Sequence, residues 1–97
     1  MNIIELKPFV INFIISRSVV DIDHEIISQG ELTLHELGLD TLDLNELIIE
    51  FENQTGTKIL SHSMNTEFTI NLIIHELLHN LFYHLTKNDK INCAKLS

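Results

Sequence analysis

Basic residues, cysteine, proline and glycine are scarce in this 97-residue chain, and each shortage excludes a class of protein. Lysine and arginine total 6 against 14 aspartate and glutamate residues, which gives a formal charge of −8. So acidic a surface repels phosphate backbones, and nucleic acid is therefore not an expected partner. A single cysteine, Cys93, cannot build a disulfide framework within the chain. One proline and three glycines leave room for long, uninterrupted helices.

Long apolar runs are also missing. The apolar segment Phe9–Ile15 is too short to cross a bilayer, and no basic segment of the secretory type precedes it. We therefore expect no membrane span and a cytoplasmic location. Hydrophobic residues nevertheless make up 44% of the chain, which is enough for one small domain with a single core.

Apolar residues recur at helical spacing in three segments, which predicts an all-α domain over residues 1–86 and a polar C-terminal tail over 87–97. The first helix is predicted from Pro8, which is tolerated at a first helical position, to about Arg17. Its β-branched residues also suit a strand, but no alternating partner strand is found elsewhere. A long connection, Ser18–Leu39, precedes a second helix from Thr41 to about Asn53. The predicted core residues of this second helix are Leu44, Leu47, Ile48 and Phe51.

The last predicted helix runs from about Thr69 to Leu85. One face of it is apolar throughout and is expected to lie against the core. The residues on that face are Ile70, Ile73, Ile74, Leu77, Leu78, Leu81 and Leu85.

The most informative segment of the chain is Leu37–Leu47, where a glycine turn leads into an amphipathic helix. Asp40 is suited to cap that helix, because its carboxylate can accept the unpaired N–H groups of the first turn. Thr41 then occupies the first helical position, with its hydroxyl held at the boundary between loop and helix. Such a position suits a covalently attached group.

This segment resembles the attachment motif of acyl carrier proteins and peptidyl carrier domains. In that family, a serine follows the aspartate and carries 4'-phosphopantetheine. The resemblance covers about residues 27–59, and the positions that agree are Leu37, Gly38, Asp40, Leu42, Glu46 and Leu47. It implies a small four-helix bundle of acyl-carrier-protein type, with three main helices, a short one, and a long loop between helices 1 and 2.

The resemblance also implies a function. A carrier of this type is not an enzyme: it holds an acyl or aminoacyl group on its arm for a fatty-acid, polyketide or peptide-assembly pathway. Thr41 would bear the arm, between Asp40 and Leu42. The acidic residues Asp43, Glu46 and Glu50 would meet basic surfaces of acyl- or aminoacyl-transferring enzymes and of a phosphopantetheinyl transferase.

Thr41 departs from the family, because it replaces the serine. Its secondary hydroxyl has a methyl group on the same carbon and a stiffer χ1 angle. Phosphoryl transfer depends strongly on positioning, so the methyl group bears directly on modification. Two alternatives follow: a carrier that is modified at Thr41, or an arm-free relative that acts only by docking on partner enzymes.

A second motif, His75-Glu76-Leu77-Leu78-His79, matches the H-E-x-x-H pattern of zinc hydrolases. In that chemistry, His75 and His79 would bind the metal and Glu76 would be the general base. His84 lacks the glycine turn that brings a third ligand round in the metzincin pattern. We therefore expect no catalytic metal site, and His75 and His79 remain weak candidates for metal binding.

Overall fold

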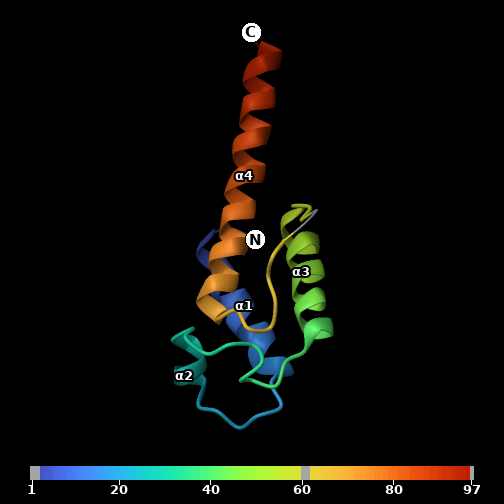
Figure 1. Ribbon diagram of the computed structural model, residues 1–97. Helices are drawn as coiled ribbons and strands as arrows, with labels where there is room; N and C mark the ends of the chain where they lie inside the picture. Colours follow the sequence, from blue (N-terminus) through green and yellow to red (C-terminus); the bar gives the residue numbers. More distant parts are fainter. Residues whose placement is uncertain (1–2, 60–61, 97) are drawn as a thin grey trace.

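The computed structural model describes residues 3–59 and 62–96, with side chains described in 3–59 and 62–85. Its helices are α1 (Ile3–Arg17), α2 (His24–Ser28), α3 (Thr41–Thr55) and α4 (Ile70–Leu96) (Figure 1). Within the described ranges, extended pairing is limited to one isolated antiparallel bridge between Thr33 and Thr69. The expectation of a small all-α domain is therefore confirmed.

All four helices contribute to one hydrophobic core. α1 lies against α2, α3 and α4, so it is the element around which the others are assembled (Figure 1). The fully buried side chains are large and aliphatic or aromatic, as close packing in a small domain requires. The largest of them are Phe51, Leu6, Ile14, Ile27, Leu34, Leu37, Leu44, Leu47, Ile70, Ile73, Leu77 and Val10.

α1 begins at Ile3 and not at the predicted Pro8, which lies inside the helix. A proline at this position removes one backbone hydrogen bond and crowds the preceding turn. The earlier start is explained by Leu6, which is buried one turn before Val10 on the same side of the helix. Burial of Leu6 offsets the lost hydrogen bond.

α4 also differs from the prediction, because its backbone stays helical beyond Leu85 to Leu96. The chain after Leu85 contains neither proline nor glycine, so nothing local stops the helix. Leu85 itself is 46% exposed, and its assignment to the core was wrong. Cys93 lies outside the residues whose side chains are described.

The connection between α1 and α3 is held by one buried side chain and by backbone hydrogen bonds to the start of α4. The short helix α2 interrupts it and buries Ile27. Further along, the Ile70 N–H donates to the Leu32 carbonyl (3.0 Å) and the Asn71 N–H donates to the Gly30 carbonyl (2.9 Å). These bonds satisfy N–H groups that the first turn of α4 would otherwise leave unpaired. The long connection is therefore a fixed part of the fold that leads into α3.

Candidate functional site

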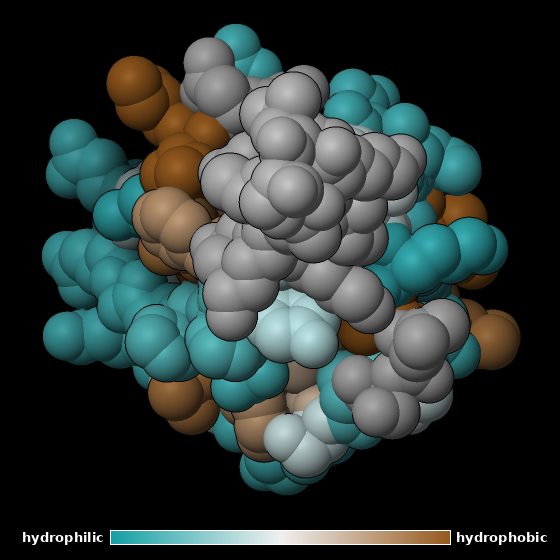
Figure 2. Space-filling view, turned by 90° about the horizontal axis from the view of Figure 1, so that it is seen from above, coloured by the Kyte–Doolittle hydropathy of each residue, from teal (hydrophilic) through white to brown (hydrophobic). Residues whose placement is uncertain are grey.

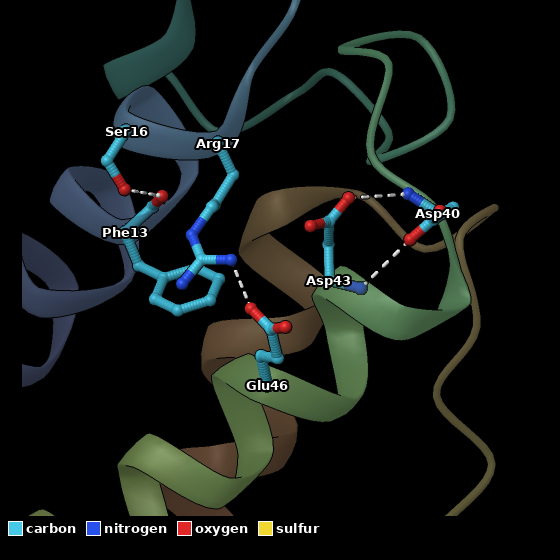
Figure 3. A network of polar contacts seen from close by, with 6 residues as sticks. All are labelled: Phe13, Ser16, Arg17, Asp40, Asp43 and Glu46. Atoms are coloured by element: carbon cyan, nitrogen blue, oxygen red, sulfur yellow. Dashed lines mark hydrogen bonds and ion pairs between the residues drawn. The ribbon is translucent and has the colours of Figure 1, made fainter.

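The start of α3 is built by a reciprocal cap between two aspartates (Figure 3). The Asp43 N–H donates to Asp40 Oδ1 and the Asp40 N–H donates to Asp43 Oδ2, each at 3.0 Å. Such a capping box satisfies two exposed donors at once and fixes where the helix begins. The predicted role of Asp40 as the helix cap is confirmed.

The turn before α3 is held by backbone bonds and by a contact with the end of α1. Gly38 adopts φ +82°, a left-handed conformation that glycine reaches without steric cost. The Leu39 N–H donates to the Leu34 carbonyl (2.9 Å), and the Ser18 hydroxyl donates to the Leu37 carbonyl (3.0 Å). The loop that leads to Asp40 is therefore hydrogen-bonded to Ser18, the residue that follows α1.

Thr41 is exposed at the first position of α3. Leu42 beside it is also exposed, with 70% of its surface accessible. The side chains that bury α3 against the core are Leu44, Leu47, Ile48 and Phe51, as predicted from their spacing. The turn and the cap thus present a hydroxyl residue at the surface, next to an exposed apolar side chain.

No protein-family model, curated protein or solved structure matches this chain. The chemistry and geometry of its own residues therefore carry the functional argument. The candidate site is the start of α3, where the motif found in the sequence is exposed at the surface.

The three acidic residues expected to meet partners occupy three different environments. Asp43 is partly buried and belongs to the capping box. Glu46 forms an ion pair with Arg17, the last residue of α1 (Figure 3). Glu50 is exposed on α3. Glu46 and Glu50 are therefore exposed to solvent, whereas Asp43 is engaged in the cap.

Sequence reasoning missed two features of this face. One is Arg17, whose pairing with Glu46 joins residues 29 positions apart and has no local signal. The other is Ile49, which is 53% exposed. Ile49 follows Leu42 by seven residues, so the two apolar side chains lie on the same side of α3, two turns apart. The exposed face of α3 thus combines apolar and acidic side chains; we call Leu42, Glu46, Ile49 and Glu50 the α3 face.

The histidine motif lies on α4. His75 and His79 are both exposed, and Glu76 between them is partly buried. Among the described residues, no group of three or more histidine, cysteine or acidic side chains is placed to hold a metal ion. A catalytic zinc site needs three protein ligands, so the described side chains do not provide one.

The outer surface of the molecule mixes polar and apolar residues. Figure 2 shows hydrophilic residues over much of one face, with smaller hydrophobic areas between them. In the described part of the chain, none of the helices has the combination of length and apolar character that a membrane span requires.

Proposed function

We propose that this protein is a carrier of acyl-carrier-protein type, which is not itself an enzyme and bears a 4'-phosphopantetheine arm on Thr41. It would hold an acyl or aminoacyl group for a fatty-acid, polyketide or peptide-assembly pathway in the cytoplasm. Its partners would be enzymes with basic surfaces that dock on the α3 face.

The observation that carries the proposal is the exposed position of Thr41. A transferase can reach a hydroxyl only if it projects from the surface in a fixed place, because in-line phosphoryl transfer requires close alignment. The capping box fixes the start of the helix, and Gly38 and Ser18 fix the turn before it. Leu42 supplies an exposed apolar contact directly beside the hydroxyl residue.

The proposal is tested by intact-mass spectrometry after incubation with coenzyme A and a broad-specificity phosphopantetheinyl transferase. The wild-type protein should gain the mass of one arm, and Thr41→Ala should gain nothing. Thr41→Ser is the positive control, because its primary hydroxyl lacks the methyl group. We expect Thr41→Ser to react faster than wild type, since a misplacement of about 1 Å can cost about a hundredfold in rate.

A second candidate is an arm-free protein that uses the same fold only for docking. The methyl group of Thr41 favours it, and so does the α3 face, whose acidic and apolar side chains need no arm to bind a basic partner. Modification of Thr41→Ser without any modification of wild type would support this candidate over the carrier.

A small zinc hydrolase is the remaining alternative from the sequence. The described side chains around His75 and His79 offer no third ligand, which disfavours it. A peptidase assay with and without chelator decides the point: chelator-sensitive activity that is lost in Glu76→Gln would overturn the carrier proposal.

A further inference from the structure

Arg17 of this same chain pairs with Glu46, on the surface where the proposed function expects cationic partners to dock (Figure 3). We propose that Arg17 is an internal counter-ion, which occupies Glu46 in the unbound protein and is displaced when a cationic protein partner docks on the α3 face. This inference rests on the docking part of the proposed function and does not depend on the arm.

Arg17 is held in place from its own side of the contact. It ends α1, where a positive charge is favoured by the helix dipole. Its guanidinium group lies 4.9 Å from the centre of the Phe13 ring, on the same helix. Phe13 is partly buried against the core, so it forms a steady platform for the arginine. Arg17 therefore reaches Glu46 of α3 from a defined position at the end of α1.

The contact is nevertheless open to exchange. The Arg17 and Glu46 side chains keep 42% and 49% of their surface exposed, so water and a partner's cation have access to the carboxylate. Exposed ion pairs contribute little to stability, because solvent screens the charges and both long side chains lose freedom. Displacement of the Arg17 guanidinium from Glu46 by a partner's arginine or lysine therefore costs the fold little stability.

The ion pair therefore lowers the affinity of the α3 face for cationic partners in particular. A cationic partner has to compete with Arg17 for Glu46, whereas binding through Leu42 and Ile49 alone leaves the ion pair intact. From the usual strength of exposed pairs, we expect this competition to lower the affinity for a cationic partner about two- to fivefold.

Other basic residues provide a matched control. Arg17, Lys7 and Lys58 are the basic residues in the part of the chain whose side chains are described. Lys7 is exposed on α1, and at 1.5 Å per residue it lies about 15 Å along the helix from Arg17. Lys7→Gln changes the net charge by the same amount as Arg17→Gln but leaves the ion pair in place.

The experiment measures binding of a fluorescein-labelled oligolysine peptide by anisotropy at low ionic strength. Arg17→Gln should bind about two- to fivefold more tightly than Lys7→Gln. The difference in affinity should disappear when each of the two substitutions is made separately in a Glu46→Gln background, because the Arg17–Glu46 contact no longer exists there. Amide shifts in NMR spectra should place the peptide on α3, and thermal melts should show that every variant is folded.

Two results would overturn the inference alone: equal binding by Arg17→Gln and Lys7→Gln, or a difference that persists in the Glu46→Gln background. A peptide that binds without shifting any α3 amide would contradict both this inference and the proposed docking face. The mass measurement on Thr41 tests the arm separately, so failure of the arm is distinguishable from failure of Arg17 as counter-ion.

Discussion

Among the residues whose side chains are described, Thr57 is buried and polar and has a hydroxyl without a hydrogen-bond partner. It follows Gly56, where the chain leaves α3, and only 2% of its surface is exposed. Its backbone N–H donates to the Thr55 hydroxyl (3.1 Å), but among the described residues its own hydroxyl has no hydrogen-bond partner. A buried hydroxyl without a partner loses its hydration and gains nothing in return.

We therefore expect Thr57→Val to raise the free energy of unfolding by about 1 kcal/mol, since valine keeps the shape and removes the hydroxyl. Thr55→Val is the matched control. The Thr55 hydroxyl donates to the Phe51 carbonyl (2.7 Å) and also accepts from Thr57, so its loss should lower stability by about 1 kcal/mol. Urea denaturation of both variants measures the difference. A destabilised Thr57→Val would mean that its hydroxyl has a partner in solution.

The roles of the acidic residues on α3 were only partly predictable from the sequence. The capping role of Asp40 is local, because the aspartate, the turn and the helix follow one another in the chain. The role of Asp43 in the same cap follows from its position three residues later, a spacing that the capping box shares. The pairing of Glu46 with Arg17 depends on how α1 lies against α3, which sequence spacing does not reveal.

At the scale of the elements, α3 was the most predictable helix. Its start at Thr41 follows from the Asp40 cap. Its predicted end at about Asn53 was two residues short of the observed end at Thr55, after which Gly56 adopts the left-handed conformation that glycine favours. The end of α1 at Arg17 was also predicted correctly, but the start of α1 and the end of α4 lack such signals. α1 starts before Pro8 because tertiary burial of Leu6 outweighs the local cost of the proline, and α4 continues past Leu85 because no residue breaks it.

The attachment of the connection to α4 was not predicted either, because it depends on contacts between residues far apart in the chain. Gly30 is buried at φ +77°, beside Asn71 of α4. The Asn71 side chain donates through Nδ2 to the Gln29 carbonyl (3.1 Å). A Cβ atom on Gly30 would clash with Asn71 Oδ1, so this side chain would have to move.

Gly30→Ala is therefore expected to cost more stability than Gly56→Ala. Both glycines have positive φ, but a Cβ atom on Gly56 meets no atom within 4 Å. The left-handed conformation should cost about 1 to 2 kcal/mol at either site. Displacing Asn71 should add about 1 kcal/mol at Gly30, for the lost hydrogen bond. Denaturant unfolding of the two variants measures the difference.

The Asn71→Ala background separates the two contributions. Once the asparagine side chain is removed, Gly30→Ala should cost no more than Gly56→Ala. An unchanged excess would show that the penalty at Gly30 has another source than Asn71, and would contradict the assigned contact.

In the molecule as a whole, the four helices share one hydrophobic core. The core includes Leu6 from α1, Ile27 from α2, Leu47 from α3 and Ile73 from α4. Each of the four helices buries side chains in this one core, so they depend on tertiary packing for their stability. The longest dimension is 55 Å against 23 and 19 Å, because α4 extends beyond the other helices (Figure 1).

The end of the core along α4 is a testable boundary. Leu81 is 4% exposed and Leu85, one turn later, is 46% exposed. Leu81→Ala should lower the free energy of unfolding by about 2 to 5 kcal/mol, because it leaves a cavity in the common core. Leu85→Ala should change stability by less than about 1 kcal/mol, as is usual for surface positions.

Equilibrium denaturation of Leu81→Ala and Leu85→Ala, followed by far-ultraviolet circular dichroism, measures both effects on the same helix. Equal losses would place the end of the core beyond Leu85 and would imply that something covers this part of α4 in solution. A large loss at Leu81 with little at Leu85 would show that the core ends between these two residues, and that α4 beyond Leu81 contributes little to the stability of the fold.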